Sequence, residues 1–251
     1  MKILTVIPTT GSPTLRQAVE SVLNQSYAET EVLVVVDGPE FENSVNEVLS
    51  GVPTEKLKIM VLPYNTGADG FYGHRIYASI SCLVDHDYIS FLDQDNWYKE
   101  NHIESLLDSM ISKKVEWAYS LRQIYDTTGN YVCDDNCESL GKWPIYLHDS
   151  QFLIDTSSFL IKRDILLRIG MAIYSKWGAD RQFYAAIKQY FPDYVCSGKY
   201  TLNYRLAGNA NSVTKEFFEN GNAVMHQRYP NGFPWVNGDA VEDPDAPFMV
   251  I

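Results

Sequence analysis

The first 111 residues alternate short apolar runs with longer amphipathic stretches. Apolar runs predict strands at residues 3–7, 32–36, 57–62 and 88–92. Apolar positions spaced three or four residues apart predict helices near 13–23, where Ser12-Pro13 marks the start, and near 103–111. A polar stretch at 42–50 and residues 72–84 are also predicted to be helical. The run at 32–36 is rich in valine, which is typical of a strand buried on both faces.

Strands separated by helices of this length favour parallel pairing with right-handed crossovers. The sequence therefore predicts an α/β fold with a Rossmann-like, mostly parallel sheet and flanking helices. Ligands of such sheets bind at the carboxyl ends of the strands. Three of the predicted strands end in polar residues, which are Pro8, Thr9 and Thr10, then Asp37, and then Asp93, Gln94 and Asp95. These strand ends are expected to form one cleft.

The second half of the chain is less regular, which predicts a smaller mixed region. Strands are predicted at 115–124, 131–132, 158–161 and 201–206, with a hairpin turn at 126–130, and helices at 163–169, from 178 and at 214–228. Because no linker interrupts the pattern, residues 1–228 are predicted to form a single domain with halves at 1–111 and 112–228. Residues 229–251, which carry four acidic side chains, are expected to form a loosely ordered C-terminal tail.

The composition of the chain excludes several classes of protein. The chain has 251 residues, 45% of them hydrophobic, which is enough for one sizeable core. A net charge of −12 argues against a general nucleic-acid binder or an anionic-membrane binder. The four cysteines lack metal-binding spacing and are expected to be reduced thiols. The chain has no signal-peptide pattern and no apolar run of about 18 residues, so we predict a cytoplasmic protein without a transmembrane segment.

Two carboxylates one residue apart, Asp93 and Asp95, follow the fourth predicted strand. Such a pair can face one divalent cation, because Mg²⁺ is held by one or two carboxylates plus substrate phosphates and Mn²⁺ prefers similar ligands. The alternative is a solvated loop in which Asp95 or Asn96 caps a helix that begins near Lys99. The neighbouring polar strand ends favour a metal site that binds a diphosphate.

Five segments in this order resemble the nucleotide-sugar half of family 2 glycosyltransferases. They are the first strand with Pro8, the helix end Ser-Val-Leu-Asn-Gln-Ser, the strand end Val-Val-Asp-Gly, the segment Asn-Thr-Gly and the motif Asp-Gln-Asp. The resemblance covers roughly residues 3–111. It implies a GT-A fold and an inverting, divalent-metal-dependent transfer of a sugar from a nucleotide-diphosphate donor to a hydroxyl acceptor. UDP-sugars are slightly preferred as donors, and the acceptor remains unknown.

The resemblance also implies roles for individual residues. Pro8, Thr9 and Thr10 would line the nucleotide pocket, and Asp37 would accept a hydrogen bond from the base. Asn65, Gly67 and Arg75 would belong to a segment that closes over the base and phosphates. Asp93 would lie near the ribose and the metal, and Asp95 would bind Mn²⁺ or Mg²⁺. The alternatives are a turn-forming Asp37 before Gly38 and an Arg75 that is a surface cation.

The second half adds candidate catalytic residues. The segment "WGADRQFYAAI" resembles the family's catalytic-base segment, which implies that Asp180 removes the acceptor proton. The family usually has Glu-Asp where this chain has Ala179-Asp180, and an ordinary acid in a first helical turn is the alternative. Asp149 and Asp155 are further candidate bases, and Trp97, Trp143, Trp177 and Tyr174 are candidates to stack on a sugar ring. The family sometimes uses a late histidine as a metal ligand, which implies this role for His226 or, less well, for His148. The alternative is a structural role for these histidines.

Parts of the sequence are also compatible with two other functions. Phosphatases of the haloacid dehalogenase type also follow an apolar strand with Asp-x-Asp, but on their first strand and with a threonine soon after. Here the motif is on the fourth predicted strand and Asn96-Trp97-Tyr98 follow it, which disfavours that class. A catalytically weak or inactive nucleotide-sugar or glycan-binding module remains open, because Ala179 and Asn96 stand where the family often has acids.

Overall fold

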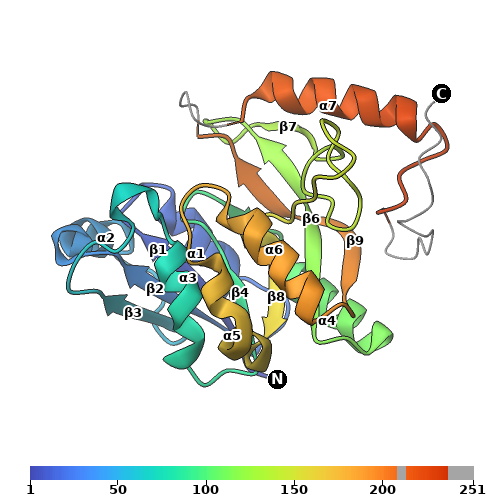
Figure 1. Cartoon of the computed structure of the whole chain (residues 1–251). Helices are drawn as coiled ribbons and strands as arrows, with labels where there is room; N and C mark the ends of the chain where they lie inside the picture. The colour runs from blue at the N-terminus through green and yellow to red at the C-terminus, as the bar shows by residue number, and fades with distance from the viewer. Residues whose placement is uncertain (208–212, 237–251) are drawn as a thin grey trace.

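The computed structural model describes residues 1–207 and 213–236 (Figure 1). Its strands are β1 Ile3–Thr9, β2 Thr30–Val36, β3 Leu57–Val61, β4 Tyr88–Phe91, β5 Trp97–Tyr98, β6 Trp117–Tyr125, β7 Tyr131–Asp134, β8 Phe159–Lys162 and β9 Val195–Arg205. Its α-helices are α1 Leu15–Leu23, α2 Glu42–Val48, α3 His74–Ser79, α4 His102–Lys113, α5 Arg163–Ile169, α6 Ala179–Tyr190 and α7 Lys215–Arg228. Short 3₁₀ helices are η1 Pro39–Phe41, η2 Ala68–Gly70, η3 Ile80–Cys82, η4 Thr156–Ser158 and η5 Gly170–Ile173.

The described strands form one sheet in the order β3-β2-β1-β4-β8-β6-β9-β5, with β7 paired to β6. Strands β3, β2, β1 and β4 are parallel, as the alternating pattern predicts. Strand β8 then runs antiparallel to both β4 and β6, and β9 pairs parallel with β6. The chain therefore has the α/β class predicted from its sequence, with a parallel first half and a mixed second half.

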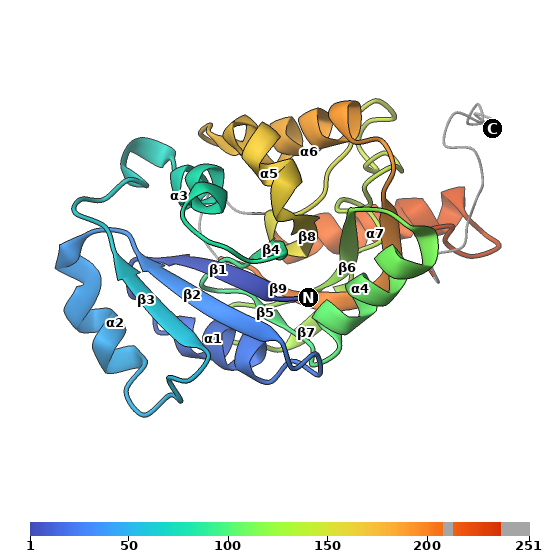
Figure 2. The same cartoon turned by 90° about the horizontal axis from the view of Figure 1, so that it is seen from below.

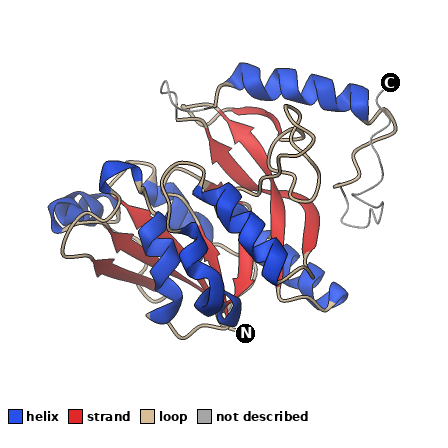
Figure 3. Cartoon of the chain, viewed as in Figure 1, coloured by secondary structure: helices blue, strands red, loops and turns tan. Residues whose placement is uncertain are grey.

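Helices cover both faces of the sheet. Figure 2 shows α3, α5 and α6 on one face and α1, α2 and α4 on the other, and Figure 3 shows how helices alternate with strands along the first half. Helix α1 buries the predicted stripe of Leu15, Ala18, Val19 and Val22. The valine-rich strand β2 is buried along most of its length, as a strand covered on both faces should be.

A short strand that the sequence pattern did not predict follows the Asp-Gln-Asp motif. Strand β5 pairs antiparallel with β9, with Trp97 opposite Asn203. The side chain of Asn96 accepts a hydrogen bond from the backbone N–H of Arg205 at 3.0 Å. Helix α4 begins only at His102 and its N-cap residue is Asn101. The alternative in which Asp95 or Asn96 caps a helix near Lys99 is therefore wrong.

The segment after α7 packs against the body of the protein as far as residue 236. Trp235 is fully buried, its ring centroid lies 5.7 Å from that of Trp143, and its Nε1 donates to Asn136 Oδ1 at 2.9 Å. This part of the expected loose tail is therefore ordered by burial of a large aromatic side chain. Residues 237–251 lie outside the described part of the chain. Trp143 belongs to the core, which removes it as a candidate for sugar stacking.

Two further expectations can be compared with the structure. All four cysteines are free thiols, as predicted. In the described segments, no helix is both long enough and apolar enough to cross a membrane.

Candidate active site

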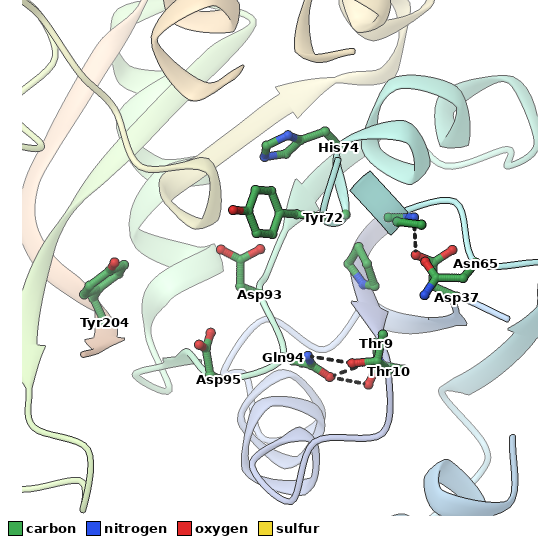
Figure 4. Close-up of a pocket in the computed structure, with 14 residues that line it drawn as sticks. Thr9, Thr10, Asp37, Asn65, Tyr72, His74, Asp93, Gln94, Asp95 and Tyr204 are labelled. Carbon is green, nitrogen blue, oxygen red and sulfur yellow. Dashed lines mark hydrogen bonds between the residues drawn. The ribbon is translucent and has the colours of Figure 1, made fainter. Parts of the chain in front are cut away.

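A cavity of about 490 Å³ opens at the carboxyl ends of β1, β2 and β4 (Figure 4). It is lined by Pro8, Thr9, Thr10, Asp37, Asn65, Gly67, Ala68, Tyr72, Gly73, His74, Asp93, Gln94, Asp95 and Tyr204. The three polar strand ends of the sequence analysis thus meet in one place. The structure adds Tyr72 from the loop before α3, His74 from the start of α3 and Tyr204 from β9.

The middle residue of the Asp-Gln-Asp motif organises the end of β1. Gln94 Oε1 accepts hydrogen bonds from Thr9 Oγ1 at 2.6 Å, from the Thr10 N–H at 3.2 Å and from the Ser12 N–H at 3.3 Å. The sequence pattern placed Gln94 at a polar strand end and indicated no role of its own for its side chain. Its side chain joins the predicted nucleotide-binding loop to the predicted metal-binding loop.

Asp37 is buried and holds the loop that follows β3. Its Oδ1 accepts from the N–H and the hydroxyl of Thr66, and its Oδ2 accepts from the Gly67 N–H, each at 2.7 Å. A Cβ atom on Gly67 would meet the Tyr72 carbonyl oxygen and would lie 2.7 Å from Asp37 Oδ2. Both carboxylate oxygens therefore fix the Asn65–Gly67 segment against the cavity, and glycine is required for that close approach.

Arg75 does not occupy the position implied for it. Its Nη1 donates to the Thr66 carbonyl oxygen at 3.1 Å, and its guanidinium lies 3.6 Å from the ring centroid of Phe71. Arg75 is not among the described residues that line the cavity. It braces the back of the 66–71 loop instead of facing the space for phosphates, and because it is half-buried it is not a plain surface cation either.

Asp93 and Asp95 both reach the cavity. Tyr77 Oη donates to Asp93 Oδ1 at 2.9 Å, and the Asp93 N–H donates to Ser157 Oγ at 3.1 Å. Burial first, and then the negative charges of Asp95 and Asp155, raise the pKa of Asp93 to about 7. Burial also raises the pKa of Asp95, which the positive charge of Arg205 opposes.

This donor set is suited to a cation that also binds phosphate. Burial and the nearby charges of Asp95 and Asp155 both disfavour the ionised form of Asp93, so a bound cation would stabilise its carboxylate. Among the described residues there is no cluster of three or more His, Cys, Asp or Glu side chains that could surround a metal by itself. Two carboxylates that leave the remaining positions to phosphate oxygens and water match the way Mg²⁺ is usually held.

Neither late histidine joins these aspartates. His226 is exposed on the last turn of α7, with its ring centroid 4.8 Å from that of Phe233, and lies apart from the described cavity wall. His148 is exposed in the loop between β7 and β8. The metal-ligand role expected for His226 is therefore wrong in this geometry, because α7 carries it on the outside of the fold.

His74 lines the cavity instead. Its Nδ1 lies 2.7 Å from the Ser175 carbonyl oxygen, so Nδ1 carries the proton that is donated. Burial lowers the pKa of His74, which keeps the imidazole neutral near pH 7. Nε2 is then an acceptor.

Asp180 lies in the first turn of α6, which follows Gly178 with a φ of 84°. The Arg181 N–H donates to Asp180 Oδ1 at 2.8 Å, and 29% of the Asp180 side chain is exposed. Burial raises the pKa of Asp180, and the Arg181 N–H and charge oppose this. Asp180 is not among the described residues that line the cavity. Its negative charge is close enough to His74, which does line the cavity, to favour the charged form of His74.

The two further candidate bases are engaged elsewhere. Asp149 is exposed and pairs with Arg228 at 3.2 Å. Asp155 is buried, pairs with Arg122 at 2.6 Å and accepts from the Ser157 N–H at 2.8 Å. Asp155 therefore serves to position Ser157, which in turn bonds to the Asp93 backbone.

A buried arginine in β6 was missed in the sequence. Arg122 forms ion pairs of 2.6–2.8 Å with Asp135, Glu138 and Asp155. Its guanidinium also lies 4.4 Å from the ring centroid of Tyr204, which lines the cavity. An arginine within an otherwise apolar strand was the signal for such a cluster, since a buried charge needs partners.

The aromatic candidates for sugar stacking differ in exposure. Trp177 and Tyr174 are exposed in the loop before α6, at 76% and 44%. Trp97 is half-buried and packs on Tyr125 with ring centroids 4.6 Å apart.

The chain was compared with known proteins. The family model described as "Glycosyl transferase family 2" matches residues 5–156. A curated relative is UDP-Glc:alpha-D-GlcNAc-diphosphoundecaprenol beta-1,3-glucosyltransferase WfgD of Escherichia coli. It is 28% identical over 131 residues, which are 52% of this chain and 45% of WfgD. The chain thus spans less than half the length of this relative.

Solved structures of TarS from S. aureus share the fold. TarS 1–349 superposes with a TM-score of 0.57 and 16% identity, covering 82% of this chain and 60% of TarS 1–349. The same protein in complex with UDP-GlcNAc gives a TM-score of 0.59 and 14% identity, covering 91% of this chain and 67% of that one. At these identities the likeness shows the fold alone, and the GT-A type expected from the sequence is confirmed.

Proposed function

Because the chain belongs to glycosyl transferase family 2, we propose that it transfers a sugar from a nucleotide-diphosphate donor to a hydroxyl group of an acceptor. The observation that carries the proposal is the cavity in which Asp37, Asp93 and Asp95 meet at the carboxyl edge of the parallel strands. Ligands of open α/β sheets bind at this edge. WfgD is named for a UDP-glucose donor and TarS binds UDP-GlcNAc, which supports a UDP-sugar as the first donor to test.

We assign the donor diphosphate to the space between Gln94, Asp93 and Asp95. The two carboxylates would hold Mn²⁺ or Mg²⁺, which supplies positive charge for the leaving diphosphate when it is bound. Tyr77 orients Asp93 through its 2.9 Å hydrogen bond. Burial raises the pKa of Tyr77 well above its ordinary value, so this hydroxyl remains a donor over the whole working range of pH.

Asp180 is assigned as the general base. It would take the proton of the acceptor hydroxyl while that oxygen bonds to the anomeric carbon, and the bond from that carbon to the nucleoside diphosphate breaks. A single displacement of this kind inverts the anomeric centre. Burial raises the pKa of Asp180, which makes its carboxylate a better proton acceptor than that of an ordinary aspartate.

Two departures from the family pattern keep a non-catalytic binding module as the second candidate. Asn96, which stands where the family often has an acid, is 2% exposed and is used to fix β9 through the Arg205 N–H. Ala179 is fully buried in place of the family's glutamate. A module of this kind would bind the nucleotide sugar without turning it over.

A thermal-shift screen followed by an activity assay tests the proposal. UDP, GDP and dTDP are added with and without Mn²⁺, and UDP with Mn²⁺ is expected to raise the melting temperature most. UDP-sugars are then assayed for release of UDP with a panel of acceptors. Asp95→Ala is expected to abolish release while the far-UV circular dichroism spectrum stays unchanged. Near-wild-type turnover by this variant would refute the metal site, and binding without any turnover would favour the binding module.

A further inference from the structure

A second cavity lies along one side of α6 and shares no lining residue with the cavity described above. It has a volume of about 560 Å³ and is formed between the loop at 150–152 and one side of the helix. We call this cavity the α6 groove. The residues that matter for its chemistry are Gln151, Phe152, Arg181, Tyr184, Lys188 and Gln189.

The α6 groove begins beside the assigned base. Arg181, Tyr184 and Lys188 recur at spacings of three and four residues, so they share one face of the helix. Arg181 directly follows Asp180, and Gln189 lies eight residues further, which corresponds to about 12 Å of helix. A molecule that presents its hydroxyl to Asp180 can therefore extend along this face.

The charges of the α6 groove are unusual for this chain. The whole chain has a net charge of −12, yet the groove contains the cations Arg181 and Lys188. Among its described lining residues there is no aspartate or glutamate. Glu138 at 3.4 Å and Asp180 at 4.0 Å from the Arg181 guanidinium offset its charge. Lys188 Nζ lies 5.0 Å from the ring centroid of Phe152. Lys188 therefore gives its end of the groove a positive charge that can bind an anion.

The remaining side chains suit a saccharide. Phe152 supplies an aromatic surface, and the amides of Gln151 and Gln189 supply both donors and acceptors for hydroxyl groups. Sites that bind small ligands combine such apolar surface with a few placed polar groups. Cations, amides and an aromatic ring together match a sugar that carries a carboxylate or a phosphate.

We propose that the α6 groove binds the non-reacting part of the acceptor and that this acceptor is an acidic saccharide. The inference rests on the proposed function and adds the chemical class of the acceptor to it. A uronate-containing chain and a phosphate-containing chain share the chemistry that the two cations recognise, and the experiment separates these two sources.

The test measures binding of three probes by isothermal titration calorimetry to the full chain. They are a hyaluronan hexasaccharide for carboxylate, the phosphorylated oligosaccharide phosphopentamannose for phosphate, and chitohexaose as the neutral control. Binding of one acidic probe at least tenfold tighter than chitohexaose is expected, and which probe binds identifies the source. Equal binding of chitohexaose, or no binding of either acidic probe, would overturn the inference.

Matched variants locate the site. Lys188→Glu and Phe152→Ala are each expected to weaken the acidic probe about tenfold or more, the size of a lost charge-assisted or stacking contact. Lys188→Arg should retain binding, and Lys58→Glu, which removes an exposed lysine on β3, should leave it unchanged. Equal weakening by Lys58→Glu, or none by Lys188→Glu, would place the acidic probe elsewhere.

The same titrations separate this inference from the function on which it rests. UDP with Mn²⁺ is titrated into the wild-type chain in parallel. Failure to bind UDP would count against the proposed function. Binding of UDP without binding of an acidic saccharide would remove the α6 groove as an acceptor site and leave the proposed function standing.

Discussion

The side-chain oxygen of Gln94 lies 2.6 Å from the hydroxyl of Thr9, and this contact joins two of the three strand ends that form the cavity. Gln94 stands between the two aspartates, so the loop that carries them and the loop after β1 share one hydrogen-bonded anchor. Three donors converge on a single amide oxygen, including the N–H groups of Thr10 and Ser12. The geometry of the metal ligands and that of the nucleotide pocket are thereby coupled.

We predict that Gln94→Ala weakens the binding of UDP with Mn²⁺. Removing the amide leaves Thr9 and two backbone N–H groups without their acceptor, which should also reduce the free energy of unfolding by about 1–3 kcal/mol. Calorimetric titration and urea denaturation measure the two effects. Asn46→Ala, the loss of an exposed amide on α2, is the control. Unchanged affinity for UDP would mean that the loop keeps its shape without Gln94.

We predict that Gly67→Ala disrupts the loop at 65–73. The added methyl group would collide with the Tyr72 carbonyl oxygen and with Asp37 Oδ2, and neither can move without losing the bonds that fix the loop. Affinity for UDP should fall tenfold or more, which corresponds to a cost of at least about 1.4 kcal/mol. Gly70→Asn is the control in the same loop, since a Cβ there meets no atom and asparagine tolerates a positive φ of 83°. Equal losses in both variants would contradict the steric argument.

We predict that Asp93→Asn stabilises the metal-free protein at pH 8. The folded-state pKa of about 7 exceeds the ordinary value of 3.8, so folding takes up a proton between about pH 4 and 7. Stability contributed by this group is thus present at low pH and lost as the pH rises through 7, a change of at most about 4 kcal/mol. Asparagine carries no charge to desolvate and can still accept from Tyr77.

Urea denaturation in EDTA at pH 5.5 and pH 8 measures this effect. The wild-type chain should gain more stability than Asp93→Asn when the pH is lowered. Asp108→Asn, an exposed acid on α4, should follow the wild type. A less stable Asp93→Asn variant at pH 8 would show that the carboxylate is not destabilising in the metal-free cavity.

The first half of the fold could be predicted because its signals are local. Each strand from β1 to β4 is a short and mostly apolar run, and α1 has a periodic stripe. Both the elements and the meeting of their carboxyl ends therefore follow from the pattern. Strand β5 could not be predicted, because two residues form it only through pairing with β9, more than 100 residues later. Long-range pairing leaves no periodic signal in a segment that short.

The positions expected for two site residues also failed because they depend on long-range packing. The family pattern placed Arg75 and His226 by sequence order, but Arg75 turns toward Phe71 and His226 lies on the outside of α7. Tertiary packing decides which way a side chain on a helix or loop points. Tyr204 reaches the cavity from β9, and only the position of β9 in the sheet brings it there.

We predict that the rate of transfer falls on acidification at a pH above the ordinary pKa of an aspartate, which is 3.8, because burial raises the pKa of Asp180. The base must be ionised, so kcat should fall tenfold per pH unit below that raised pKa. The assay uses saturating Mn²⁺, donor and acceptor, so that kcat reports neither the titration of Asp93 nor a binding step. Asp180→Asn should lower kcat by about two to four orders of magnitude and abolish the acid limb.

A second variant tests the direction in which the pKa of Asp180 responds to a neighbouring charge. The charge of Arg181 lowers the pKa of Asp180, so Arg181→Gln should raise this pKa further and move the acid limb of kcat to higher pH. A residue that served only to bind the acceptor would change KM and leave the midpoint of kcat in place. Removing a neighbouring cation can only make a carboxylate harder to ionise, so a midpoint that moves to lower pH would mean that another group accepts the proton. A wild-type pH profile in Asp180→Asn would lead to the same conclusion.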